Sequence, residues 1–124
     1  MTFVGSTFSI ILGKLLKVMR DTYPHGDLSQ SDVAKVLDTS VMSISRLEKG
    51  TAELTVSDLE KISHFFEIPA DKLLTLAITI KNILIEQKCL VLSNKHEAKK
   101  MKDLKMIDSQ MIYELCLKLY KQKN

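Results

Sequence analysis

The sequence predicts an all-α protein. Glycine and proline, which interrupt helices, occur only four times and twice in 124 residues. Few segments alternate polar and apolar residues with the period of a strand, whereas several repeat apolar residues every three or four positions. A hydrophobic content of 45% argues against general disorder. A chain of this length can form one domain with an appendage, and we expect a helical domain at residues 1–70 and a helical extension at residues 71–124.

The first helix is expected from about residue 7 to residue 22. Its apolar residues recur at helical spacing, which places them on one face: Phe8, Ile11, Leu12, Leu15 and Met19. The segment Tyr23-Pro24-His25-Gly26 follows, and its proline and glycine end the helix.

Two short helices separated by a turn are expected next. Ser29 is a favourable N-cap, and Asp32, three residues later, completes an approximate capping box. The turn begins at Asp38, a residue type that tolerates the left-handed backbone conformation better than most. Ser40 can cap the second helix, and Gly50 ends it where a positive φ is most easily accommodated.

The apolar residues of these two helices leave one face of the second helix exposed. Ala34 lies where the helices cross, and a larger side chain there would push them apart. The inward positions of the second helix are Ile44 and Leu47. Its exposed face contains Val41, Met42, Ser45, Arg46 and Lys49. A helix held clear of its own core by a preceding helix has the shape that enters the major groove of DNA.

A fourth helix begins after Thr55, which forms a capping-box pair with Asp58. Its apolar positions are Leu59, Ile62, Phe65 and Phe66. Pro69 suits the first turn of a fifth helix, and the apolar segment at residues 73–92 continues it. From Asp71 onward, polar residues recur every three or four positions, which indicates a helix: Asp71, Thr75, Thr79, Asn82 and Glu86. Its charged side chains also make it a poor membrane span.

About two-thirds of the circumference of this fifth helix is apolar. This is a larger apolar surface than a single neighbouring domain can cover. The alternating spacing of three and four predicts a helix–helix seam with a polar residue, Gln87, inside it. The partner is either a last helix at about residues 109–121 or the same helix of a second subunit. The predicted dimerisation residues are Leu73, Leu76, Ile80, Ile83, Leu84, Gln87, Leu90, Leu115 and Leu119.

Residues 7–74 resemble the phage repressor/Cro-like, XRE-type helix-turn-helix domain of bacterial regulators. The residues that carry the resemblance are Gln30, Ala34, Ile44, Ser45, Glu48 and Gly50, together with Leu12, Gly13 and Arg20 of the first helix. The resemblance covers a little over half of the chain. It implies a five-helix, lambda-repressor-like DNA-binding domain, here followed by a helical dimerisation extension.

The resemblance also assigns roles to individual residues. It implies that Gln30 donates a hydrogen bond to a DNA phosphate and that Lys49 contacts the DNA backbone. It places the base-reading positions at Ser40, Val41, Met42, Ser43, Ser45 and Arg46. Arg46 can specify a guanine through two hydrogen bonds, or else contact a phosphate or a carboxylate. Glu48 is expected to pair with Arg20 and tie the second helix of the motif to the first helix of the domain.

Positive charge is concentrated in the second half of the chain. Residues 1–70 have seven basic and nine acidic side chains, a net charge of −2, whereas residues 71–124 have a net charge of +5. Phosphate neutralisation must therefore come from a local cluster, such as Lys14, Lys17, Arg46 and Lys49, or from the second half. Residues 93–105 are rich in lysine and are either a solvated connection or a supplementary phosphate-contacting segment.

The main functional hypothesis is a transcriptional regulator, a repressor that binds double-stranded DNA at an inverted-repeat operator as a homodimer. The alternative is an antitoxin-like or anti-activator module whose second half binds another protein, with DNA binding autoregulatory or lost; excess apolar surface motivates it.

An enzyme is the least expected class. The three histidines are scattered, and the sequence contains no metal-ligand spacing, phosphate loop or nucleophile elbow. We expect no cofactor. Cys89 and Cys116 lie among apolar residues and are expected to be buried thiols. Residues 1–12 do not resemble a signal peptide, and we expect a cytoplasmic protein without a membrane segment.

Overall fold

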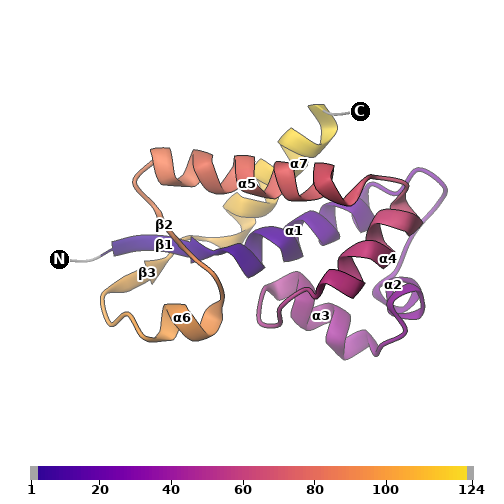
Figure 1. Cartoon of the computed structure of the whole chain (residues 1–124), viewed down its shortest axis with the longest axis horizontal. Coiled ribbons are helices and arrows are strands. Elements are labelled where there is room, and N and C mark those ends of the chain that lie inside the picture. The colour runs from indigo at the N-terminus through magenta and orange to yellow at the C-terminus, as the bar shows by residue number, and fades with distance from the viewer. Residues whose placement is uncertain (1–2, 123–124) are drawn as a thin grey trace.

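The computed structural model describes residues 3–122 and shows a mostly helical chain with one small sheet (Figure 1). Within this range the elements are β1 (Phe3–Thr7), α1 (Phe8–Asp21), α2 (Gln30–Leu37), α3 (Val41–Lys49), α4 (Val56–Phe66), α5 (Ala70–Glu86), β2 (Leu90–Leu92), α6 (Lys95–Lys99), β3 (Leu104–Met106) and α7 (Ser109–Gln122).

The helix boundaries predicted from capping residues are confirmed. The Ser29 side chain accepts a hydrogen bond from the backbone N–H of Asp32 at 3.1 Å, and the Asp32 carboxylate accepts from the backbone N–H of Ser29 at 2.8 Å. Thr55 and Asp58 form the same reciprocal pair at the start of α4. Asp38, after α2, has the expected left-handed conformation with a φ of 54°. Each of these helices therefore begins where a short polar side chain satisfies its first N–H groups.

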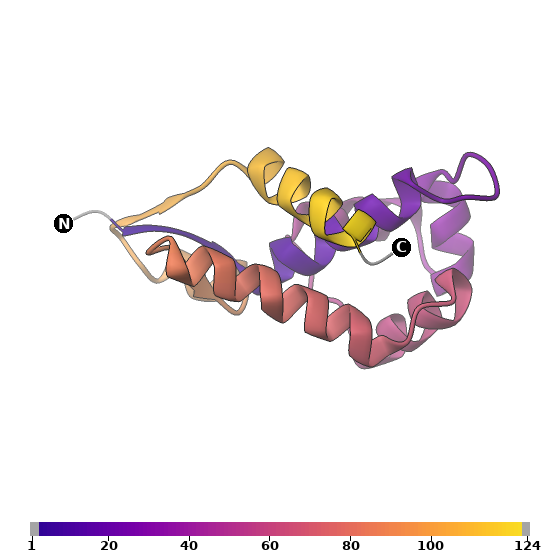
Figure 2. The ribbon, with the colours of Figure 1, turned by 90° about the horizontal axis from the view of Figure 1, so that it is seen from above.

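α1 is shared by two hydrophobic clusters. One face of α1, including Leu16 and Met19, packs with α2, α3 and α4 around Ile44 and Ile62. Another face, including Ile11 and Leu15, packs with α5 and α7. α5 and α7 lie on two sides of α1 in the view from above (Figure 2). The second half of the chain is therefore built onto the same helix that supports α3.

The expectation of an all-α fold is wrong in one respect, because three strands form a parallel sheet of order β2-β1-β3. Gly5 of β1 lies opposite Leu90 of β2 and also opposite Met106 of β3. Two of the strands have only three residues, too few to show an alternating pattern in the sequence. The pairing also joins segments more than 80 residues apart, which no local signal indicates.

The fifth helix is shorter than predicted. It ends at Glu86, Gln87 is its C-cap, and Lys88 has a φ of 65° that stops the helical path. Leu90 lies in β2, so its assignment to a helical seam is wrong. The apolar character that suggested a continuing helix belongs to a half-buried strand of the sheet.

The seam residues of α5 face the interior of the same chain. Leu73 packs in the cluster around α2 to α4, and Leu76, Ile80 and Leu84 pack against α1 and α7. These four side chains are buried without any second subunit. Ile83, Leu115 and Leu119 are half-buried, and Gln87 is exposed. In the single chain, α7 is thus a partner of α5.

Residues 93–105 are more structured than either sequence-based interpretation required. They contain the short helix α6 and most of β3, which returns beside β1. The backbone N–H and the hydroxyl of Ser9 both donate to the carbonyl oxygen of Ser93 at 3.2 Å. The segment is consequently fixed to the N-terminal turn of α1.

Cys116 is expected to resist thiol reagents in the folded protein. Its side chain is fully buried between α7 and α1, and burial raises its pKa to about 12. At pH 8 the group therefore stays protonated, and the thiol form is a poor nucleophile. Titration with DTNB should label half-buried Cys89 first and Cys116 only in denaturant. Equal labelling rates in the native protein would contradict this.

Candidate nucleic-acid interface

The outward face of α3 carries the side chains predicted to read bases. Met42 and Val41 are 62% and 46% exposed, whereas Ile44 on the opposite face is fully buried. Arg46 and Lys49 are also exposed and follow Met42 at intervals of four and three residues. They form one stripe along the helix. A single face of α3 therefore combines apolar contact groups at its start with two cations toward its end.

The hydroxyl groups of Ser40 and Ser43 take part in hydrogen bonds at the N-terminus of α3. The Ser40 hydroxyl oxygen accepts a hydrogen bond from the backbone N–H of Ser43 at 3.1 Å, and the two hydroxyls lie 2.9 Å apart. This satisfies one N–H of the first turn. Ser45 is half-buried one turn further along. Of the predicted base-reading set, the exposed side chains with the longest reach are Met42 and Arg46.

A close helix crossing fixes how far α3 projects. A Cβ atom built on Gly13 of α1 would lie 2.0 Å from the carbonyl oxygen of Leu47 and 3.1 Å from that of Glu48. Only a residue without a side chain permits this approach. The last turn of α3 therefore rests directly on the backbone of α1.

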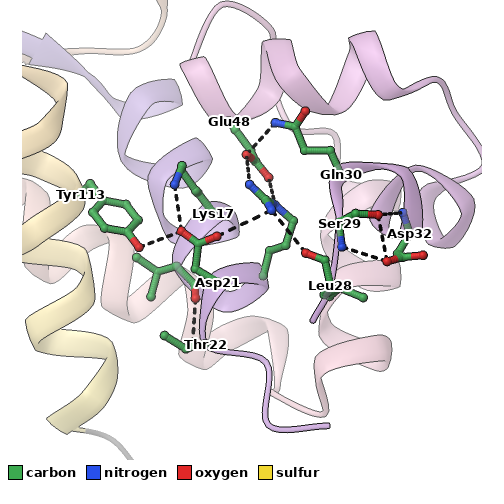
Figure 3. Close-up of polar contacts among 11 residues, drawn as sticks. Lys17, Asp21, Thr22, Leu28, Ser29, Gln30, Asp32, Glu48 and Tyr113 are labelled. Carbon is green, nitrogen blue, oxygen red and sulfur yellow. Dashed lines mark hydrogen bonds and ion pairs between the residues drawn. The ribbon is translucent and has the colours of Figure 1, made fainter. Parts of the chain in front are cut away.

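An ion-pair network from the same helix, α1, also holds α3 (Figure 3). Arg20 of α1 donates through Nε to Glu48 Oε2 at 2.7 Å and through Nη2 to Glu48 Oε1 at 2.9 Å. The structure thus joins the pair that the resemblance implied, in a bidentate geometry. Glu48 is only 3% exposed, and its bond raises the pKa of Arg20 above the ordinary value. A third bond, from Arg20 Nη1 to the Leu28 carbonyl at 3.3 Å, reaches the segment before α2.

Comparison with protein families identifies the segment that contains this arrangement, since residues 16–73 match the helix-turn-helix family. Residues 16–73 are a helix-turn-helix domain of the XRE/Cro/CI type. A helix-turn-helix domain of this type implies DNA binding, and the family is generally not enzymatic. No curated protein and no solved structure matches the chain. The sheet, α6 and α7 lie outside the matched segment.

Gln30, which is expected to contact a DNA phosphate, also takes part in the Arg20–Glu48 network. Its side-chain amide donates to Glu48 Oε1 at 3.0 Å. A primary amide has two N–H donors, so this bond leaves a second donor for a phosphate oxygen. Glu48 therefore aligns the residue at the start of α2 with the end of α3, and Arg20 neutralises the charge between them.

A second polar cluster, which the sequence analysis did not predict, continues the network toward α7. Asp21 lies 3.6 Å from Arg20 Nη1 and accepts hydrogen bonds at 2.8 Å from Lys17 and from the hydroxyl of Tyr113 (Figure 3). Burial, followed by the bond to Asp21, raises the pKa of Tyr113 to about 12. The Tyr113 contact spans 92 residues and has no local signal in the sequence. It links α7 to the helix that carries Arg20.

Across residues 3–122, no three His, Cys, Asp or Glu side chains are grouped so that they could hold a metal ion. No helix in the part of the chain described by the structure has the length and apolar character needed to cross a membrane.

Proposed function

We propose that this chain is a transcriptional repressor that binds an inverted-repeat operator as a homodimer, with α3 in the major groove. The observation that carries the proposal is the exposed stripe of α3, held by the Arg20–Glu48 pair inside a helix-turn-helix domain. An oriented recognition helix needs such fixation because base contacts depend on position. Arg46 reads a guanine, Val41 and Met42 contact thymine methyl groups, and Gln30 and Lys49 contact phosphates.

The homodimer is supported by the outer face of α5. Leu74, Ile78 and Ile85 are exposed and spaced by four and seven residues, so they lie on one side of the helix. Ile83 is half-buried and lies on the opposite side of the helix, next to the buried face. We place the contact between subunits on this outer face, because Leu73, Leu76, Ile80 and Leu84 already pack inside the chain. Two-fold symmetry then sets the recognition helices about 34 Å apart.

The experiment is selection of duplexes from a random-sequence pool, followed by titration of wild-type protein and variants on the selected duplex. Arg46→Ala should weaken discrimination at one base pair of each half-site by about 1–3 kcal/mol. Adding Gln30→Ala should weaken binding further on all sequences, because a phosphate contact carries no sequence information. The mass of the complex should correspond to two chains per selected duplex.

The matched control is Lys118→Ala, which removes one exposed cation from α7. It should leave sequence discrimination unchanged. If the Gln30→Ala/Arg46→Ala variant bound the selected duplex as wild type does, the reading face assigned to α3 would be wrong. A complex containing one chain on a duplex with both half-sites would contradict the homodimer.

A further inference from the structure

The small sheet positions α6 beside the C-terminal end of the recognition helix. A hollow of about 290 Å³ lies between them. Lys49, Gly50 and Thr51 line it from the end of α3, and Lys95 and Lys99 line it from α6. Both helices lie along the lower side of the molecule in Figure 1. Lys49 belongs to the exposed stripe of α3 as well as to this hollow, so it joins the two surfaces.

Contacts on both sides hold α6 in this position. β2 precedes α6 along the chain and β3 follows it, and both strands pair with β1. Its N-cap, Asn94, accepts a hydrogen bond from the backbone N–H of Glu97 at 3.0 Å and donates through its amide to Glu53, in the loop between α3 and α4. The lysines of α6 are therefore presented from a backbone fixed against the helix-turn-helix domain.

The charge of this segment complements a polyanion. Residues 93–105 contain five lysines and two carboxylates. Glu97 pairs with Lys100 at 3.4 Å. For Lys95 and Lys99, both exposed, no carboxylate among residues 3–122 is within salt-bridge distance. Residues 1–70 have a net charge of −2, so the helix-turn-helix half alone has no excess of positive charge with which to bind DNA phosphates.

We propose that α6 is a second DNA contact, in which Lys95 and Lys99 bind backbone phosphates at the edge of the groove that α3 enters. This inference rests on the proposed function. The nine residues of α3 span about 13 Å, close to the major-groove width of about 12 Å. With the first turn of α3 at the bases, its last turn lies near the bordering phosphates, and α6 lies next to that turn. α6 supplies affinity without reading sequence.

The test compares wild-type protein with Lys95→Gln/Lys99→Gln on the selected duplex and on an unrelated duplex over a range of salt concentrations. Loss of two phosphate contacts per subunit, four per homodimer, should reduce the slope of log K against log salt by about 3.6. Affinity should fall by the same factor on both duplexes, and the unfolding temperature should not change. Lys118→Gln/Lys121→Gln, with the same charge change on α7, should keep the wild-type slope.

Neutral methylphosphonates at the edge of the groove give an independent readout. Replacing the phosphates there should weaken wild-type binding but have less effect on the double variant, because the variant no longer uses those phosphates. If the wild-type protein selects an operator and the double variant keeps its salt slope, the α6 contact is wrong and the proposed function stands. A small-anion site in the hollow predicts that same unchanged slope. A wild-type protein without sequence preference overturns both proposals.

Discussion

Gly13→Ala is expected to destabilise the protein by about 3 kcal/mol, the upper end of the usual cost of overpacking. The added Cβ would lie 2.0 Å from the carbonyl oxygen of Leu47, so α1 and α3 must separate. At an exposed helical position the same substitution normally stabilises by about 0.5–1 kcal/mol, because glycine loses more backbone entropy on folding. The sign of the change therefore tests the close crossing. Urea unfolding followed by circular dichroism measures it.

Ser31→Ala on the exposed face of α2 is the control, expected to change stability by less than about 0.5 kcal/mol. The Gly13→Ala protein that remains folded should also bind the selected operator more weakly, because the end of α3 has moved. A Gly13→Ala variant as stable as wild type, or more stable, would show that α3 does not rest on the α1 backbone.

Arg20→Met should cost about 3 kcal/mol, because it leaves Glu48 buried without its cation. Glu48 is 3% exposed and, among residues 3–122, would retain only the single side-chain hydrogen bond from Gln30. Replacing both residues, in Arg20→Met/Glu48→Met, removes the uncompensated charge and should recover much of the lost stability. Urea unfolding of the two single variants and the double variant forms a double-mutant cycle, and the expected coupling exceeds about 1 kcal/mol.

Measuring operator binding by the same variants separates the effect of the pair on stability from its effect on the orientation of α3. The double variant should fold well but bind the operator more weakly than wild type, because apolar contacts do not fix α3 and Gln30 as the bidentate pair does. Lys118→Met, which removes an exposed cation of α7, should leave operator binding unchanged. Losses from Arg20→Met and Glu48→Met that simply add would mean that the pair is not a unit.

The sequence predicted the features whose causes are local. Ser29 with Asp32 and Thr55 with Asp58 are separated by three residues, and each pair forms the expected capping box. Hydrophobic spacing and caps together located α1 to α4 within a residue or two. The Arg20–Glu48 pair spans 28 residues, and only the family resemblance indicated it.

The features that the sequence did not predict depend on distant partners. β1 pairs with strands that begin at Leu90 and Leu104, and neither strand is long enough to show its own period. Apolar residues continue past Glu86, so hydrophobic spacing predicts a helix at Leu90, although the backbone turns at Lys88. Helical spacing identified the buried face of α5 correctly as a packing surface, but spacing does not distinguish a partner in the same chain from one in a second subunit.

Because α1 is shared between two clusters, we expect the molecule to unfold as one cooperative unit rather than as two separate domains. A cut after residue 70 would remove α5 and α7 and expose Ile11, Leu15 and Val18 of α1 to water. It would also expose one face of α1, the helix on which α3 packs at Gly13. We therefore expect the extension and the recognition helix to lose their structure in the same unfolding step.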